Sequence, residues 1–294
     1  MFDLRYHVAS LAAVFLMLVV GILIGVGISG RGFVSDAERT RLNGDIADLR
    51  AQLDASNADV DDLRRRQKAA EDFVKGAYPA LVENRLTGKR VAVLVLGSVD
   101  PTVGFVERAL DDSGAHLARM RSLTLPLRLE NVEAALSEKP EFSGYLGDKQ
   151  LVNLGRDLGR ELVVGGKTPL WDALEGEIVE QRRGGLGDPV DGVVVIRTAE
   201  PQAGASARFV AGLYAGPGST GVPVVGVEPS RVEQSAIPAF QHHSLSTVDG
   251  IDTELGRLAL VLLLAGPETG NYGIRDTADD GILPPIEPLP APSG

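Results

Sequence analysis

Four histidines and three methionines are the best transition-metal ligands in this sequence, because it contains no cysteine. Two of the histidines, His242 and His243, are adjacent. Neighbouring residues point to opposite faces of a strand, or about 100° apart on a helix, so an adjacent pair seldom holds one ion. The pair is therefore a weak candidate metal site, and exposed or hydrogen-bonded histidines are the alternative interpretation.

Polar side chains follow the short apolar runs that we expect to be buried strands. In an open α/β sheet the ligand crevice lies outside the carboxyl ends of the strands. Side chains there could hold a hydroxylated ligand or a cation. The same residue types are typical of loops and helix N-caps, so a purely structural role stays open. The candidates for this crevice are Ser98, Asp100, Glu200, Glu228 and Asp249.

The familiar enzyme motifs fail on inspection. Gly166-Lys167-Thr168 resembles the end of a phosphate-binding loop, but Glu161 stands where that pattern requires glycine. The segment Gly216–Gly221 matches G-x-G-x-x-G, yet it follows a helical pattern and precedes a strand pattern, the reverse of the dinucleotide-binding context. We expect it to be a flexible turn. Since G-x-S-x-G and H-E-x-x-H are also missing, the sequence predicts no enzyme, no catalytic residue and no evident cofactor.

Charge and composition exclude further classes. The 294 residues include 29 Lys and Arg against 40 Asp and Glu, a net charge of −11. Nucleic-acid binding depends on clustered basic residues, so we expect no nucleic-acid partner. Without cysteine the chain has no disulfide, thiolate zinc site or cysteine nucleophile.

Apolar periodicity indicates an α/β domain over residues 88–266. Continuous β-branched runs predict strands at 91–96, 193–196 and 222–227, with weaker candidates at 116–120 and 244–248. The alternation of these strands with helical patterns predicts an open three-layer domain with a parallel sheet of four to five strands. Six prolines and five acidic residues against one basic residue predict a disordered acidic tail over 267–294. The helical patterns between the strands cover 103–110, 129–136, 146–163, 170–181, 205–214 and 252–264.

Residues 8–28 contain no charged side chain and, as a helix, would span about 30 Å, the thickness of a hydrocarbon core. We expect a transmembrane helix; a cleaved signal sequence, the alternative, has a shorter apolar region. Gly21 and Gly25 have the small-xxx-small spacing that lets two such helices pack. Counting Lys and Arg does not decide the orientation. We expect residues 1–7 to be a short cytoplasmic tail and the bulk of the chain to be extracytoplasmic.

A heptad pattern follows the apolar segment, over residues 36–76. Mostly β-branched residues at heptad position a and leucine at position d are typical of a parallel, two-stranded coiled coil. The g–e′ pairs of such a dimer, Asp45–Arg50 and Asp59–Arg64, are opposite in charge. We therefore predict a coiled-coil stalk that forms a parallel homodimer. An amphipathic helix packed on its own domain is the alternative. The residues of the predicted dimer seam are Leu42, Ile46, Leu49, Leu53, Val60 and Leu63.

Two stretches carry a family resemblance. FDLRYHVASLAAVFLMLVVGILIGVGI, residues 2–28, resembles the N-terminus of the actinobacterial MctB copper-transport family. VDGIDTELGRLALVLLL, residues 248–264, together with the following Gly270-Asn271-Tyr272-Gly273, is similar to the C-terminal region of that family. The resemblance implies copper transport or homeostasis in the cell envelope, with copper as the only implied metal.

The SteB proteins, corynebacterial relatives, imply a different role. They act with a membrane partner in cell separation, upstream of peptidoglycan hydrolases. The alternative function is therefore a non-catalytic dimeric scaffold with a membrane-bound division partner. A channel in an outer membrane needs a closed barrel of alternating strands, whereas this chain shows one apolar helix and a parallel-sheet pattern. The residues thus favour an anchored interaction module.

Overall fold

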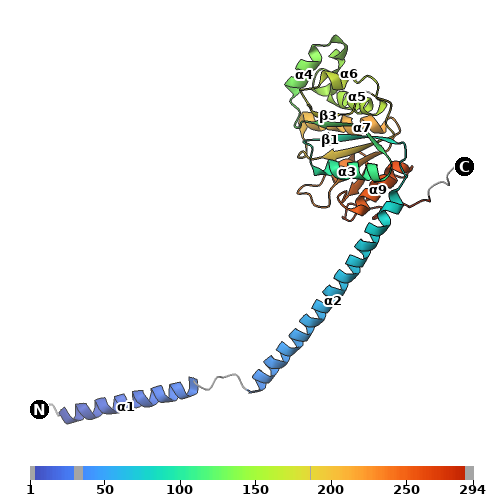
Figure 1. Cartoon of the computed structure of the whole chain (residues 1–294). Helices are drawn as coiled ribbons and strands as arrows, with labels where there is room; N and C mark the ends of the chain where they lie inside the picture. The colour runs from blue at the N-terminus through green and yellow to red at the C-terminus, as the bar shows by residue number, and fades with distance from the viewer. Residues whose placement is uncertain (1–3, 30–35, 186, 289–294) are drawn as a thin grey trace. The chain divides into compact units, whose positions relative to one another are not determined.

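A computed structural model describes residues 4–29, 36–185 and 187–288 of the chain (Figure 1). The chain divides into two compact units, Met1–Ala70 and Glu71–Gly294. The first unit contains α1 (Leu4–Ser29) and most of α2 (Asp36–Val82). The second contains the end of α2 and every other helix and strand of the described residues.

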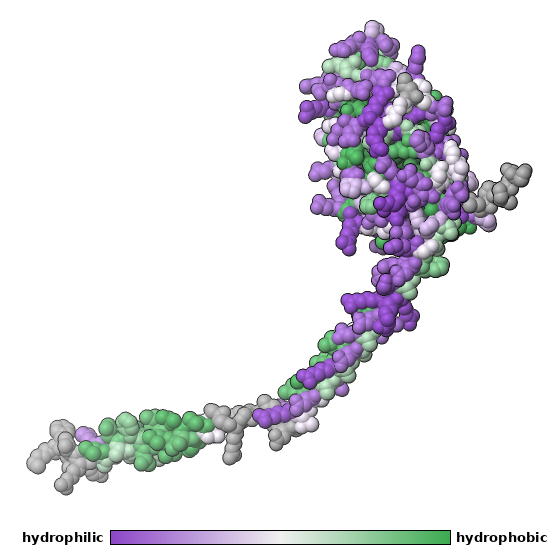
Figure 2. All heavy atoms as spheres, viewed as in Figure 1, coloured by the Kyte–Doolittle hydropathy of each residue, from purple (hydrophilic) through white to green (hydrophobic). Residues whose placement is uncertain are grey.

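Helix α1 is apolar around most of its circumference, and Figure 2 shows most of its described side chains in green. Over the described part of the chain it is the one helix long and apolar enough to cross a membrane, between His7 and Gly27. The side chains of that stretch are exposed, so no part of the protein covers them.

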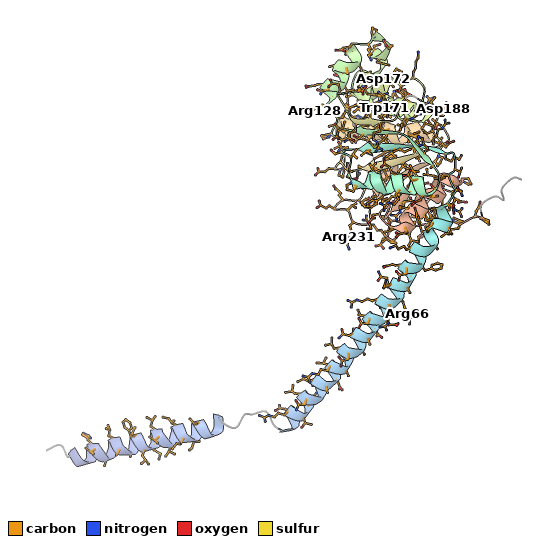
Figure 3. All side chains as sticks on the ribbon, viewed as in Figure 1. Arg66, Arg128, Trp171, Asp172, Asp188 and Arg231 are labelled. Atoms are coloured by element: carbon orange, nitrogen blue, oxygen red, sulfur yellow. The ribbon has the colours of Figure 1, made fainter. Side chains whose placement is uncertain are left out.

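Helix α2 is polar and continuous from Asp36 to Val82. Ion pairs three or four residues apart support it, including those between Arg64 and Asp61 (3.3 Å) and between Arg66, labelled in Figure 3, and Asp62 (2.7 Å). Its last turns differ in character, because Tyr78 and Val82 are buried in the core of the second unit. The helix thus extends beyond the predicted end at residue 76.

A mixed sheet of seven strands forms the centre of the second unit, in the order β3-β2-β1-β4-β5-β6-β7. Six strands run parallel, and β3 pairs antiparallel with β2, so the prediction of a parallel sheet of four to five strands is wrong in both respects. The two unpredicted strands lie at the edges and are short or polar, and such strands carry little apolar signal. The strands are β1 (Arg90–Leu96), β2 (His116–Leu123), β3 (Val179–Arg183), β4 (Gly192–Arg197), β5 (Val224–Glu228), β6 (Ser246–Asp249) and β7 (Asn271–Tyr272).

Helices cover both faces of the sheet, as the predicted three-layer arrangement requires (Figure 1). One face packs against α3 (Pro101–Asp112), α9 (Glu254–Ala265) and the end of α2. The other face carries the remaining elements, and Trp171, Phe209 and Phe240 fill its core. Those elements are α4 (Leu129–Ser137), η1 (Pro140–Tyr145), η2 (Asp148–Gln150), α5 (Leu151–Val164), α6 (Pro169–Ala173), α7 (Gly204–Gly218) and α8 (Ile237–His242).

Two helical predictions are wrong in extent. The pattern at 170–181 forms the short α6 and the edge strand β3, because Gly176 at φ +88° ends the helical turn between them. The predicted helix over 146–163 begins only at Leu151, after Gly147 at φ +89° and the short helix η2.

The glycine-rich segment 216–221 is not a flexible turn throughout, because α7 continues through Gly216 and Pro217 to Gly218. The glycines serve a close helix contact: a Cβ on Gly212 would overlap the Val152 carbonyl of α5, and one on Gly216 would overlap the Arg156 carbonyl. Gly155 and Gly159 play the matching role on α5. Glycine at 216 therefore serves packing between helices, whereas Gly221, at φ +81°, serves the turn that follows α7.

The segment after α9 is ordered, contrary to the predicted disordered tail. It supplies β7, and Tyr272 is buried against the same core as α9. Prolines and acidic residues do not prevent this, because the order comes from hydrogen bonds to strand ends far away in the sequence. We call residues 273–288 the C-terminal strap; residues 289–294 of the predicted tail lie outside the described residues.

Candidate functional site

The topological switch point of the sheet lies between β1 and β4, where the strand order reverses. After β1 the chain continues to β2 on one side of β1, and from β4 onward it builds the sheet on the other side. Open α/β sheets bind ligands beside such a point, outside the carboxyl ends of the strands. A cavity of about 320 Å³ is found there. It is lined by residues that follow β1, β4 and β5, including Asp100, Arg197, Glu200, Glu228 and Glu233.

Asp100 lies in this cavity and also caps α3. Its carboxylate accepts hydrogen bonds from the main-chain N–H of Thr102 (2.9 Å) and from the Thr102 hydroxyl (3.1 Å). Ser98 does not line the cavity, and its carbonyl oxygen accepts a hydrogen bond from the Thr198 hydroxyl (2.8 Å). Both residues thus shape the loops, and Asp100 alone of the two lines the cavity.

Glu228 is almost fully buried at 3% exposure, and its carboxylate is occupied by the protein itself. It accepts hydrogen bonds from the Ser235 hydroxyl (2.8 Å) and the Ala236 N–H (2.6 Å), and it forms an ion pair with Arg275 of the C-terminal strap. The Arg275 guanidinium also donates to the Ser230 carbonyl oxygen (2.6 Å). Glu228 therefore closes the end of β5 and leaves no oxygen free for a ligand.

Asp249 at the end of β6 is separated from the cavity by the same strap. Its carboxylate accepts the main-chain N–H groups of Ile274 (2.9 Å) and Arg275 (3.1 Å). A Cβ on Gly273 would overlap this carboxylate, so glycine is required at the start of the strap. The expectation that Asp249 belongs to the ligand crevice is wrong, because the strap covers this strand end.

Exposed charges remain at the mouth of the cavity. Glu200 and Glu233 are exposed there beside Arg231, labelled in Figure 3, while Arg197 donates to the Ser235 carbonyl oxygen (2.9 Å). Asp252, which does not line the cavity, is held by Ser230: burial would raise its pKa, but the hydrogen bonds from the hydroxyl and N–H of Ser230 hold the pKa below the ordinary value. The lining of charged, polar and apolar residues fits a small polar ligand better than an apolar one.

Two arginines on β2 are buried, which the apolar pattern of that segment did not predict. Arg119 and Arg121 are 2% and 1% exposed and donate to carbonyl oxygens, Arg119 to Asp188 (2.6 Å) and Arg121 to Arg183 (2.9 Å). Burial, together with the neighbouring charges of Arg182 and Arg119, lowers the pKa of Arg121 to about 10. These contacts hold β3 and the loop after it, which is a structural task.

The described residues contain no group of three or more His, Asp or Glu side chains that could hold a metal ion. The candidate pair ends α8, with His242 as its last residue and His243 next. Contrary to the expectation for neighbours, the two imidazole rings lie together, with centroids 5.1 Å apart and planes at 79°.

The predicted packing residues of the first unit are all accessible. Apart from the adjacent backbone of α1 itself, no protein atom lies within 4 Å of a Cβ placed on Gly21 or Gly25. The six seam residues of α2 are between 41% and 65% exposed. An apolar stripe of this kind on a polar helix is open to a partner.

Comparison with known proteins shows which family the chain belongs to. The family described as "Copper transport outer membrane protein, MctB" matches residues 1–283. The chain is 29% identical to the protein named Copper transporter MctB of Mycobacterium tuberculosis over 313 residues, which cover 93% of this chain and 96% of that protein, and the same values hold for Mycobacterium bovis. The Mycobacterium leprae protein of that name is 27% identical over 328 residues, covering 97% of this chain and all of the relative. The match spans both compact units, and the chain therefore belongs to the MctB family.

Proposed function

We propose that this protein is a single-pass, membrane-anchored envelope protein that acts in copper transport or homeostasis as a parallel homodimer. The family match over residues 1–283 carries the proposal, because it includes the apolar helix, the long polar helix and the α/β domain together. The names of the mycobacterial relatives supply the link to copper.

The surface of α1 supports membrane anchoring. An apolar helix without a charge between His7 and Gly27 is strongly disfavoured in water when nothing covers it, whereas a bilayer accepts it at the observed length. We place the short N-terminal tail in the cytoplasm and the α/β domain outside, since long domains cross largely regardless of their charge.

Orientation can be measured cleanly because the chain has no cysteine. A Glu233→Cys variant carries a single thiol at an exposed position of the α/β domain. We expect a membrane-impermeant maleimide to label it in intact cells. Labelling only after the cells are broken would contradict the proposed orientation.

The exposed seam of α2 supports dimerisation. The a positions Ile46, Leu53 and Val60 and the d positions Leu42, Leu49 and Leu63 are apolar and uncovered. Burying two such stripes against each other would remove them from water, and the opposite charges of the flanking g and e′ positions favour the parallel, in-register arrangement.

Two matched double variants test the seam. Ile46→Asp with Leu49→Asp places two charges in the seam, while Ala51→Asp with Ala58→Asp adds the same charge on the outer face of the helix. In detergent micelles, sedimentation should find monomers for the first variant and dimers for the second and the wild type. Dimers of equal stability in both variants would remove the seam from the proposal.

We infer that the α/β domain contributes by binding a small polar ligand, since a cavity with charged and polar lining lies at the carboxyl ends of β1, β4 and β5. The role in copper homeostasis is tested in cells. A strain that lacks the protein should tolerate less copper than its parent, and the wild-type gene should restore the tolerance. Equal copper tolerance and equal cellular copper in the two strains would reject this role.

A further inference from the structure

Two half-buried side chains of opposite charge line the cavity at the carboxyl ends of β1, β4 and β5. Arg197 is the last residue of β4, and Asp100 follows β1. Among the described residues neither of them forms an ion pair, with the other or with any third side chain. Two opposite charges that line one cavity without pairing can be bridged by a ligand that carries both charges.

The protein holds the arginine in place through a chain of hydrogen bonds. The Arg197 guanidinium donates to the Ser235 carbonyl oxygen (2.9 Å). The Ser235 hydroxyl donates to Glu228 (2.8 Å), which is 3% exposed and forms an ion pair with Arg275. Arg197 is therefore positioned before any ligand arrives, which reduces the entropy lost on binding. A guanidinium has several N–H donors, so most of them stay available to a ligand.

The start of α3 holds the carboxylate. Asp100 accepts hydrogen bonds from the main-chain N–H of Thr102 (2.9 Å) and from its hydroxyl (3.1 Å), and Thr102 is 2% exposed. Each carboxylate oxygen can accept more than one hydrogen bond. Asp100 thus keeps the capacity to accept hydrogen bonds from an ammonium group of a ligand.

The balance of charge disfavours a ligand of one sign. Glu228 adds little net charge to the cavity because Arg275 pairs with it. The exposed charges at the mouth, on Glu200, Glu233 and Arg231, are screened by water and salt. The two half-buried charges therefore have the larger effect: Arg197 repels a simple cation and Asp100 repels a simple anion. A zwitterion is attracted by both.

The size and the remaining lining limit the ligand further. The cavity of about 320 Å³ lies near the lower end of the range of about 300–1,000 Å³ for small-molecule sites. The buried side chains Ile196 and Val227 belong to its lining and offer apolar surface. A small zwitterion with a short apolar part fits these properties.

We propose that this cavity binds a small zwitterion of the α-amino acid class, with its carboxylate on Arg197 and its ammonium group on Asp100. This inference rests on the proposed binding of a small polar ligand by the α/β domain, and it names the chemical class of that ligand. Both contacts are hydrogen bonds between charged groups, which are stronger than those between neutral groups.

The test uses the full-length protein in uncharged detergent micelles and four small molecules of similar size. L-valine and its isomer δ-aminovalerate carry both charges, close together in the first and far apart in the second. L-valinamide carries the positive charge alone, and isovalerate carries the negative charge alone. By NMR titration we expect at least one zwitterion to bind about ten- to a hundredfold more tightly than both singly charged molecules, because each of these loses one charged hydrogen bond.

Two variants assign the two ends of the ligand. Arg197→Met should abolish the preference for the zwitterion over valinamide and keep the preference over isovalerate. Asp100→Asn should do the reverse, and asparagine is as good an N-cap of α3 as aspartate. A variant that only damaged the fold would weaken all four molecules together and would leave both preferences unchanged.

Arg128→Met and Asp111→Asn are the matched controls. They remove the same charges at exposed positions outside the cavity, and Arg128 is labelled in Figure 3. Both should keep the two preferences of the wild type. The proposal is overturned if neither zwitterion binds, if a singly charged molecule binds as tightly as the better zwitterion, or if the two cavity variants keep the wild-type preferences.

The outcomes also separate this inference from the proposed function. If valinamide or isovalerate binds as tightly as the zwitterions and a cavity variant removes that binding, the small polar ligand is retained and the zwitterion is rejected. Zwitterion binding in a protein whose deletion leaves copper tolerance unchanged would retain this site and reject the cellular role.

Discussion

At the scale of single residues, Glu161 makes the stability of the α/β domain depend on pH. Its carboxylate accepts the main-chain N–H groups of Leu170 (3.1 Å) and Trp171 (3.3 Å) at the start of α6. Burial outweighs these hydrogen bonds and raises its pKa from 4.5 to about 7. Between these values the folded state binds more protons than the unfolded state. The stability that the protonated Glu161 contributes is therefore fully present below pH 4.5 and is lost as the pH rises through 7.

A Glu161→Gln variant should lose this pH dependence, because the amide oxygen still accepts a hydrogen bond and carries no charge. We expect urea unfolding to give a free energy for the wild type that falls between pH 5 and pH 8 by more than it falls in the variant. The exposed Glu138→Gln serves as control and should follow the wild type. Parallel curves for all three proteins would show that Glu161 is not the titrating group.

Arg275 stabilises the domain because it is the charged partner of the buried Glu228 carboxylate. Replacing Arg275 by alanine leaves the Glu228 carboxylate without its charged partner, and breaking such a pair from one side costs about 3 kcal/mol. We expect this loss in the free energy of unfolding, measured by denaturant titration.

Arg231→Ala removes an exposed arginine from the same region and should change the unfolding free energy by less than about 0.5 kcal/mol. Replacing both members of the pair, with Glu228→Gln and Arg275→Met, should cost less than Arg275→Ala. An equal loss for Arg275→Ala and Arg231→Ala would mean that the buried pair does not stabilise the domain.

The candidate site was predictable only in part. Asp100 and Glu200 lie where strand-end logic places them, because the carboxyl ends of parallel strands share one edge of the sheet. The partner of Glu228 was not predictable, since Arg275 is 47 residues away and lies in a segment that reads as disordered from composition alone. The approach of the two histidine rings was equally hidden, because side-chain rotation is not a property of sequence spacing.

At the scale of elements, α5 and α7 approach each other at glycines. A Gly212→Ala variant places a methyl group against the Val152 carbonyl and should destabilise the domain by roughly 2 kcal/mol. Gly104→Ala, in α3, is the matched control: its Cβ meets nothing within 4 Å, so helix propensity should stabilise it by about 0.5–1 kcal/mol. Thermal unfolding of the two variants should therefore shift in opposite directions, and a common direction would refute the packing argument.

Apolar runs made β1, β4 and β5 predictable, because strands buried on both faces consist almost entirely of valine, leucine and isoleucine. The edge strands β3 and β7 were not predicted, because they lack such an apolar run. β3 carries exposed Glu180 and Gln181, and β7 has only two residues, so pairing with a neighbour and not side-chain burial defines both.

At the scale of the whole molecule, the α/β unit is larger than residues 88–266. Tyr78, Val82 and Leu86 are at most 6% exposed, and the Tyr78 hydroxyl donates to Asp112 (3.0 Å) beneath the guanidinium of Arg257. At the other end, β7 completes the sheet and the C-terminal strap binds the carboxylate at the end of β6. The sequence pattern had assigned the end of α2 close to the predicted stalk, and β7 and the strap to the predicted disordered tail.

A fragment with residues 71–288 should therefore unfold cooperatively, and one with residues 88–266 should be partly unfolded at 25 °C. Each missing buried side chain removes about 1.5–3 kcal/mol, which together reaches the whole stability of a typical domain. Circular dichroism melting curves compare the two fragments. Equal melting temperatures would show that the ends of the unit contribute nothing to its core.

The strap also orders events in time. A ribosome makes Glu228 and Asp249 before it makes the groups that satisfy them, Arg275 and the main-chain N–H of Ile274. While the chain is still attached, two carboxylates at neighbouring strand ends have to stay in water, so β5 and β6 cannot be buried in their final form. Both strand ends can accordingly reach their final packing only after Ile274 and Arg275 have left the ribosome.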